Sequence, residues 1–354
     1  MRTLTTRELN RTTLHRQLLL ERADRPAADV IEHLVGMQAQ EPLAPYYGLW
    51  SRTRGFRPDE LVELLTGRHA VRATLHRATI HLVTAADHGR LEPLLRPFLH
   101  RRFASSPFRH AVAGVDLDEF TATAAGLLEQ PRTRPELGRE LAARWPDRDT
   151  AALGQAATAL APTVQVPPRG LWGRGGRARW TTAAHWLPAT APAAPVEELV
   201  RRYLAAFGPA SVRDLQTWSG ATRLAPVVEA MDLPRFTDPT GRVLHDLPDA
   251  PLVDPDVPAP PRFLPEFDNL LLGHHDRTRV ISGEDYRRGI VVGGRPTLLV
   301  DGFVHGTWRL TPGGLRIRVL RPLDRTRRAE VEAEGAALLR FAGTDGDVAI
   351  TAGD

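Results

Sequence analysis

The feature that most constrains this fold is an order of helix-capping residues, prolines and glycines that recurs in three segments. It is clearest between residues 116 and 186. There Thr133-Arg134-Pro135-Glu136 is a capping box, whose Thr and Glu side chains satisfy backbone amides at a helix start. Asp149 caps the next helix, and Pro162 ends it because proline cannot donate a helical hydrogen bond. Two short strands around a loop rich in Gly and Arg follow, so we predict helices and then a β-hairpin in each segment.

The same pattern gives ranges for all three segments. In the first, Thr5 and Glu8 have the spacing of a capping box. We predict helices over 5–22, 26–38 and 57–67 and a hairpin over 71–83. In the second we predict helices over 117–129, 133–145 and 150–161 and strands over 164–166 and 179–183. After an Ala/Pro-rich linker over 188–195, the third has helices over 196–207, from Ser211 and from Thr222, and a hairpin over 235–246.

The C-terminal part changes to strand patterns after a Pro/Asp/Ala-rich stretch over 248–261. Asp301-Gly302 between two apolar runs is a strong hairpin signal. We predict a small sheet or barrel, a closing helix over 325–341 and a frayed last dozen residues. The fold class is therefore α+β, with repeated modules followed by a small β domain.

Composition excludes several kinds of chemistry. The chain has no Cys, which excludes disulfides, thiolate nucleophiles and Cys-ligated zinc. It has no Lys, so all 46 basic side chains are Arg, and neither a P-loop lysine nor a Schiff base on a side-chain amine is possible. The polar residues Met1 to Asn10 do not resemble a signal peptide, and we expect a cytoplasmic protein. The net charge of +4 makes nucleic acid a plausible partner.

Gln38 and Gln40 lie where the helix pattern of the first segment ends. Pro42 and Pro45 are expected to end any helix near Gln40, so that the pair lies at a helix end or in an extended exit. Residues two apart in an extended chain point the same way, so both amides can hold one water. The alternative is that they are ordinary polar residues at the end of a helix.

Four blocks together resemble one protein family. They are Gln38-Ala39-Gln40-Glu41-Pro42, the run 45–52, the run 71–83, and the run 264–277 that begins Leu264-Pro265-Glu266-Phe267-Asp268-Asn269. In order and spacing they resemble the bacterial winged-helix DNA glycosylases of the AlkZ and YcaQ kind. The resemblance implies three winged-helix domains and a β-barrel-like domain. Their expected ranges are 1–115, 116–190, 191–250 and 251–354.

The resemblance places the catalytic motif on Gln38 and Gln40. It implies hydrolysis of the N-glycosidic bond of an alkylated purine, above all a bulky N7-alkylguanine. N3-alkyladenine and interstrand crosslinks remain open as further substrates. Some relatives carry Asp at the second position, and Gln40 instead resembles the branch linked to self-resistance against DNA-alkylating natural products.

This chemistry suits a pair of amides. An N7- or N3-alkylated purine already carries positive charge and is a good leaving group without protonation. The sugar develops oxocarbenium character, so the protein has to place a water and supply oriented dipoles. Without lysine, the enzyme is expected to be monofunctional and to use water as its nucleophile. Asp268 is the candidate for the carboxylate that the Gln pair lacks.

Several further residues are candidates for contact with DNA. Arg-rich loops on a wing suit phosphate or minor-groove contact, although a solvated loop is the alternative. The hairpin and the downstream block can either touch the lesion or brace the fold. These candidates are Arg72, His76, Arg77, His81, Arg174, Arg177, Arg179, Asp268, Asn269, His274 and Arg277.

His274-His275-Asp276 invites a metal site, but neighbours on a strand point to opposite faces, and we expect no metal and no cofactor. The expected partner is double-stranded DNA with alkylated purines, bound by a monomer in the cytoplasm at the nucleoid, without a membrane. Two rival functions remain. One is a non-catalytic winged-helix DNA-binding protein or transcriptional regulator, and the other is a small-molecule-binding protein with a degenerate DNA surface.

Overall fold

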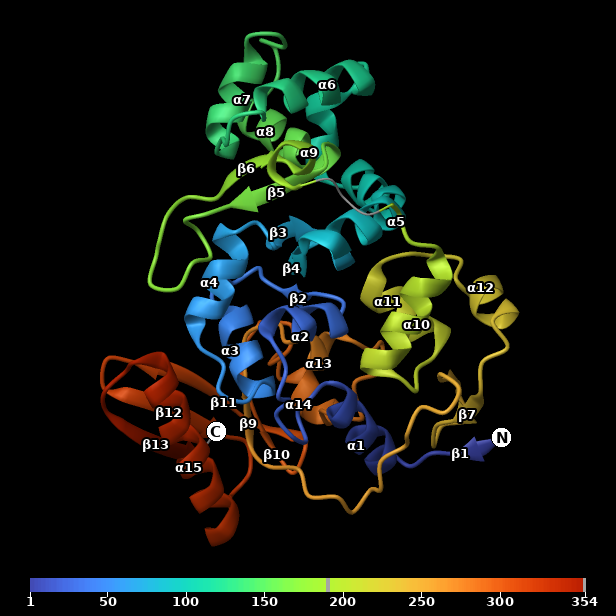
Figure 1. Cartoon of the computed structure of the whole chain (residues 1–354), viewed down its shortest axis with the longest axis vertical. Helices are drawn as coiled ribbons and strands as arrows, with labels where there is room; N and C mark the ends of the chain where they lie inside the picture. The colour runs from blue at the N-terminus through green and yellow to red at the C-terminus, as the bar shows by residue number, and fades with distance from the viewer. Residues whose placement is uncertain (189–191, 353–354) are drawn as a thin grey trace. The chain divides into compact units, whose positions relative to one another are not determined.

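The α+β chain divides into two compact units in a computed structural model that describes residues 1–188 and 192–352 (Figure 1). Unit 1 comprises Met1–Arg57, Glu197–Trp218 and Arg223–Asp354, and unit 2 comprises Pro58–Val196 and Ser219–Thr222. These limits do not coincide with the four expected domains, whose boundaries remain a prediction. Residues 189–191 of the expected linker lie outside the described residues.

Unit 2 is built on strands that run in the order β4-β3-β5-β6. The hairpin of the first segment, β3 (Ala70–Thr74) and β4 (Ile80–Thr84), is confirmed, as is that of the second, β5 (Thr163–Val166) and β6 (Arg179–Thr182). β3 pairs antiparallel with β5, so the two hairpins form one sheet.

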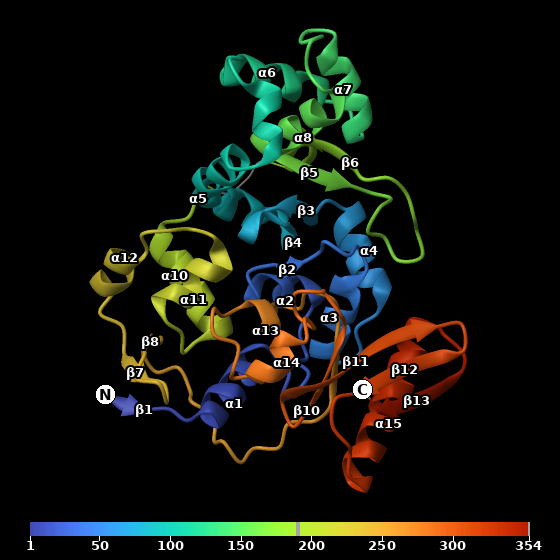
Figure 2. The ribbon, with the colours of Figure 1, turned by 180° about the vertical axis from the view of Figure 1, so that it is seen from behind.

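The helices of the second segment gather beside β5 and β6 (Figure 2). They are α6 (Leu117–Leu127), α7 (Arg134–Ala142) and α8 (Thr150–Leu160), close to the predicted ranges. The capping box at Thr133 is present. A Cβ on Gly138 would lie 1.9 Å from the carbonyl oxygen of Thr150, so α7 and α8 pack backbone against backbone. Unit 2 also contains α4 (Pro58–Thr66), the 3-10 turns η1 (His76–Ala78) and η2 (Pro107–Val112), and α9 (Ala183–Trp186).

The C-terminal sheet of unit 1 has the order β13-β12-β11-β10-β9. Its strands are β9 (Arg262–Leu264), β10 (Thr297–Val300), β11 (Phe303–Thr311), β12 (Gly314–Val319) and β13 (Asp347–Ala352). The predicted turn at Asp301-Gly302 is present, with both residues at positive φ. The closing helix α15 (Arg325–Ala342) is also present and lies beside the sheet (Figure 1).

The expectation of a frayed C-terminus was wrong. β13 pairs parallel with β12 from Gly314↔Asp347 to Val319↔Ala352. Polar and apolar residues alternate only weakly along β13, and few of its side chains are large and apolar. The strand therefore depends on hydrogen bonds to β12, which is distant in sequence. A local sequence pattern cannot report such pairing.

Most of the third segment lies in unit 1, apart from Val196 and Ser219–Thr222, and it largely follows the prediction. α10 (Val196–Phe207) has the predicted bounds, α11 (Val212–Ser219) follows Ser211, and α12 (Ala225–Ala230) is shorter than expected. The hairpin is β7 (Arg235–Thr237) and β8 (Val243–His245). It is joined by β1 (Arg2–Thr3), which pairs parallel with β7, so the N-terminus completes this small sheet.

The first two helices end earlier than predicted. α1 (Thr6–Arg16) begins at the predicted capping box, but Leu18 then has φ 57° and the helix does not reach residue 22. α2 (Ala27–His33) ends before Val35 and Gly36, which have φ values of 56° and 93°. A positive φ cannot continue a right-handed helix, so the chain turns before it reaches Gln38.

Two helices that contain proline were not predicted. α3 (Ala44–Arg52) begins shortly after Pro42, and Pro45 occupies its first turn, where no amide donor is needed. α5 (Ala85–Ala104) contains Pro93 and Pro97 and was not predicted. Two further short helices, α13 (Asn269–Leu272) and α14 (Gly283–Arg287), complete unit 1.

An aromatic cluster connects α3 with α15 and the C-terminal sheet. The ring of Phe341 stacks on Trp50 at 5.6 Å and meets the edge of Tyr47 at 5.7 Å. Tyr47 also meets Trp308 on β11 at 5.7 Å. α3 is therefore held on one side by the C-terminal part, which fixes the base of the segment that carries the Gln pair. Within the described residues, every helix is too short or too polar to cross a membrane.

Candidate functional site

The Gln pair lies between two elements of unit 1. Gln38 is the second residue of β2 (Met37–Gln38) and is buried, with 8% of its surface exposed. Gln40 lies in the bend that follows and is exposed. The two amides therefore differ in environment, although they are two residues apart in a non-helical segment, as predicted. A buried and an exposed amide together are suited to hold a molecule at the protein surface.

A strained turn precedes the pair. Val35 is β-branched, yet it adopts φ 56°, a conformation that such residues rarely occupy. The amide of Gly36 donates to the carbonyl of Ile31 at 2.9 Å, and the Asn269 side-chain amide donates to the carbonyl of Gly36 at 2.6 Å. Asn269 is buried at the start of α13, so a distant part of the sequence fixes the turn. Strain of this kind concentrates at functional sites.

Packing between β2 and α3 holds the segment from its other side. A Cβ on Gly48 would come within 2.5 Å of Met37 Cε and 3.7 Å of Pro265 Cγ. Glycine at this position therefore leaves room for the Met37 side chain on the surface of α3, with Pro265 packed close to the same position. Thus two residues of the 264–277 block hold or approach the segment before Gln38: Asn269 bonds to Gly36, and Pro265 packs near Gly48.

Asp268 is occupied by a buried ion pair. Arg52 donates from Nη1 to Oδ2 at 2.8 Å and from Nη2 to Oδ1 at 2.7 Å. The two side chains are 0% and 2% exposed. Oδ1 also accepts from the Leu270 amide and caps α13. With both oxygens bound, Asp268 is a brace between α3 and α13, and it is poorly placed to take a proton from water.

Glu266 is a second carboxyl group near the Gln pair. It is half-buried, and the residue after it, Phe267, has φ 56° with its ring packed over Gly294. Burial raises the pKa of the Glu266 carboxyl above its ordinary value, and the nearby charge of Glu41 raises it further. Burial, together with the charge of Glu266, raises the pKa of Tyr47 to about 12. Sequence analysis does not distinguish Glu266 from its neighbours. What distinguishes this residue is its burial and the effect of the Glu41 charge on it, and both depend on the fold.

The hairpin of unit 2 carries two buried imidazoles at its turn. His76 and His81 contact edge to face at 5.1 Å. His81 Nδ1 lies 3.0 Å from the carbonyl of Thr79, and its Nε2 lies 3.1 Å from Arg77 Nη2. Burial, reinforced by the Arg77 charge, lowers the pKa of His81 well below its ordinary value. A neutral His81 with a proton on Nδ1 satisfies both contacts, so it orients the half-exposed Arg77.

The loop between β5 and β6 contains the remaining arginines of the predicted wing. Arg174 and Arg177 are exposed at its tip. Arg179, by contrast, donates to the carbonyl of Pro131 from Nε at 3.1 Å and from Nη2 at 2.5 Å. Arg72 is buried under the loop, where a Cβ on Gly170 would lie 2.9 Å from its Cδ. Two of these four side chains are thus available to a ligand and two hold the loop.

A sequence model described as DNA glycosylase AlkZ-like matches residues 31–341 of the chain, which includes both the Gln pair and the 264–277 block. The chain belongs to the AlkZ-like DNA glycosylase family. The structure is similar to that of the Streptomyces sahachiroi DNA glycosylase AlkZ, with a TM-score of 0.82 and 22% sequence identity. The match covers 99% of this chain and 100% of that one. No curated protein sequence matches the chain.

The protein is therefore a DNA glycosylase that acts on DNA. After α13 of this glycosylase, Gly273 and His274 are buried, whereas His275 is exposed. His274 donates from Nε2 to the carbonyl of Phe207 at 2.9 Å, and it packs against the rings of Phe207 and Tyr203. Burial lowers the pKa of His274. Arg277 donates to the carbonyl of Leu271 at 2.7 Å. These contacts brace the fold of unit 1, and the predicted DNA contact of His274 and Arg277 stays a prediction.

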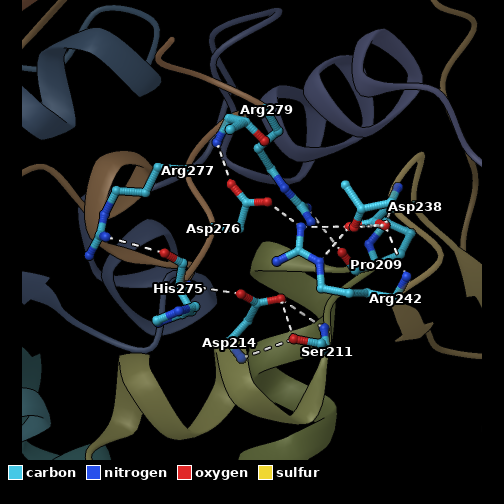
Figure 3. Close-up of polar contacts among 11 residues, drawn as sticks. Pro209, Ser211, Asp214, Asp238, Arg242, His275, Asp276, Arg277 and Arg279 are labelled. Carbon is cyan, nitrogen blue, oxygen red and sulfur yellow. Dashed lines mark hydrogen bonds and ion pairs between the residues drawn. The ribbon is translucent and has the colours of Figure 1, made fainter. Parts of the chain in front are cut away.

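A polar network of the glycosylase connects this block with the third segment (Figure 3). The His275 amide donates to Asp214 at 2.8 Å, and Asp214 in turn accepts from the Ser211 hydroxyl at 2.7 Å. Arg242 forms ion pairs with Asp276 and Asp238. His275 and Asp276 thus have separate structural partners. Throughout residues 1–188 and 192–352, no three His, Asp or Glu side chains are grouped as metal ligands.

Proposed function

We propose that this DNA glycosylase hydrolyses the N-glycosidic bond of alkylated purines, in particular a bulky N7-alkylguanine, and leaves an abasic site. Self-resistance to a DNA-alkylating natural product is the proposed biological role. The observation that carries the proposal is the position of Gln38 and Gln40. They follow a strained turn at Val35 that is held by Asn269. A rigid segment of this kind can hold a water molecule in place before the reaction. This lowers the activation free energy of hydrolysis, because the water need not be ordered during the reaction.

Neither side chain of the Gln pair is a general acid, and a cationic leaving group does not need one. Amides donate and accept hydrogen bonds but do not protonate a base. An N7-alkylated guanine needs no protonation, because its positive charge is neutralised when the glycosidic electron pair returns to the ring. Oriented amide dipoles then suffice to stabilise the oxocarbenium-like sugar. Since every basic side chain is Arg, the nucleophile is water and no lysine-dependent lyase step follows.

We further propose that the protein binds duplex DNA as a monomer through three winged-helix modules and a C-terminal β domain. The exposed Arg174 and Arg177 suit phosphate contact, and the half-exposed Arg77 on the hairpin turn suits contact with DNA. The buried candidates Arg72, His76 and His81 support these side chains from below. Asp268, Asn269 and His274 are likewise proposed to support the site.

Base release from defined duplexes tests the proposed activity. Duplexes with N7-methylguanine, N3-methyladenine or a bulky N7 adduct are incubated with the wild-type protein, and the free base is measured by mass spectrometry. We expect release of the free alkylated base with an intact abasic strand, fastest for the bulky adduct. Strand cleavage without alkali would contradict a monofunctional enzyme. Tight binding to one undamaged sequence with no release of any base would favour the regulator instead.

The wing arginines give a separate prediction about DNA affinity. Replacing Arg174 and Arg177 together by alanine removes two phosphate contacts, so the slope of log affinity against log salt concentration should fall by about 2. Fluorescence anisotropy with undamaged duplex measures it. Arg144→Ala is the matched control, since Arg144 is an exposed arginine of unit 2 that pairs with Glu119. An unchanged slope in the double variant would show that the wing does not touch phosphate.

A further inference from the structure

Glu266 lies between two chain neighbours that pack near the segment that carries the Gln pair. Pro265, directly before it, packs near Gly48 of α3, which the Met37 side chain also approaches. Asn269, three residues after it, donates to the carbonyl of Gly36 at 2.6 Å. Along the chain, Glu266 is therefore bounded by a residue packed near α3 and by a residue bonded to the turn before Gln38. Because Phe267 adopts φ 56°, the backbone at Glu266 is turned out of any regular strand or helix.

Two titratable groups of unit 1 interact electrostatically with the Glu266 carboxyl. Tyr47 lies on α3, and burial together with the Glu266 charge raises its pKa to about 12, so it remains a neutral phenol. Glu41 follows Gln40 directly, and its charge acts on Glu266. Because the Glu266 carboxyl interacts with both Tyr47 and Glu41, it lies near the start of α3 and the bend at Gln40.

We propose that Glu266 is the proton acceptor for the water that Gln38 and Gln40 position. This inference rests on the proposed function and adds the base that two amides cannot supply. The oxygen of the water forms a bond to C1′ of the sugar as the bond from C1′ to N9 breaks. The electron pair of that bond returns to the cationic purine and leaves it neutral. The proton from the water passes to the Glu266 carboxylate, so charge and atoms balance without a further reactant.

The other two carboxyl groups near the pair are less suitable. Both oxygens of Asp268 are bound to Arg52, which would have to be released before Asp268 could take a proton. Glu41 is exposed to bulk solvent in the bend after Gln40 rather than partly enclosed by protein. Glu266 is half-buried, and a raised pKa makes its carboxylate a stronger base than an ordinary glutamate. It therefore combines access with basicity.

The test is the single-turnover rate of base release from N7-methylguanine duplex as a function of pH, with the spontaneous rate subtracted. Glu266 is active as the carboxylate, so the wild-type rate should be constant above its pKa. It should fall about tenfold per pH unit below that pKa, which lies above the ordinary value of 4.5. Glu266→Gln should lower the plateau rate by about 100-fold or more and abolish this acid limb.

Two further variants separate catalysis from structure. Glu284→Gln, an exposed carboxyl of unit 1 that pairs with Arg288, is the matched control and should keep both plateau and limb. Glu41→Gln removes a charge that raises the Glu266 pKa, so its acid limb should move to lower pH. Melting temperature and DNA affinity of each variant are measured alongside.

The outcomes are distinguishable. Glu266→Gln within threefold of wild type at every pH, or slow but with the acid limb intact, would overturn the inference and leave the glycosylase proposal standing. If Glu266→Gln does not fold, the Glu41→Gln profile decides, because an unmoved limb overturns the inference. Wild type that releases no base from any of the adducts would overturn the proposed substrate class and this inference together.

Discussion

Alanine in place of Gln38 or Gln40 is expected to slow base release by about 100-fold in each case. The loss of one preorganised hydrogen-bonding group that orients a reacting water has about this effect. Gln38 is buried in β2, so its removal also leaves a small void, whereas Gln40 is exposed and its removal should leave stability unchanged. The double variant should be little slower than either single one, because both amides act on the same water.

Single-turnover release of N7-methylguanine measures the effect, with DNA affinity and melting temperature recorded for each variant. Gln130→Ala is the matched control, since Gln130 is an exposed amide of unit 2. Rates that stay within threefold of wild type in both single variants would remove the pair from the mechanism. Gln40→Asp should retain activity, because a carboxylate at this position can also hold the water and accept its proton.

Alanine in place of Asp268 is expected to destabilise the protein by about 3–5 kcal/mol. Arg52 would remain buried, 0% exposed, without the carboxylate that binds both of its terminal nitrogens. The start of α13 would lose its cap at the same time. Because α13 carries Asn269, the strained turn before Gln38 should loosen, so base release should fall along with stability.

Chemical denaturation followed by circular dichroism measures this change. Asp324→Ala is the matched control, because Asp324 also caps a helix, α15, but is exposed and has no buried partner. It should cost only about 1 kcal/mol, the usual value for an N-cap. Replacing Arg52 by Met and Asp268 by Leu together should recover most of the loss, since no unpaired charge is left. A stable Asp268→Ala variant that is inactive would instead assign Asp268 a role in the chemistry.

Helix starts and tight turns were predictable from the sequence, because residues that are close together in the chain determine them. The capping boxes at Thr5 and Thr133 begin helices as predicted, and Asp301-Gly302 makes its turn. α3 was not predicted because Pro45 was considered only as the end of a preceding helix, although proline also fits the first turn of a helix. β13 was missed because its stability comes from pairing with β12, which the local pattern does not contain.

The candidate site was predictable in its residue types but not in its contacts. Gln38 and Gln40 were identified from the motif and its neighbours, yet their unequal burial depends on how β2 packs against α3. Asp268 was the expected carboxylate, and its ion pair with Arg52 spans 216 residues of sequence. Glu266 lies in the same block without any distinguishing signal. Only tertiary packing determines which of the two carboxyl groups is bound and which is accessible.

The single sheet shared by two hairpins has a consequence for how such enzymes diverge. β3 pairs with β4 on one side and with β5 on the other, so each hairpin covers an edge of its neighbour. A fragment over 116–186 would expose the edge of β5 and invite aggregation, although its helix caps look self-sufficient. Recombination between relatives is therefore expected to exchange residues 70–182 as one block. The hairpin turn and the wing would then be inherited together and evolve as a pair.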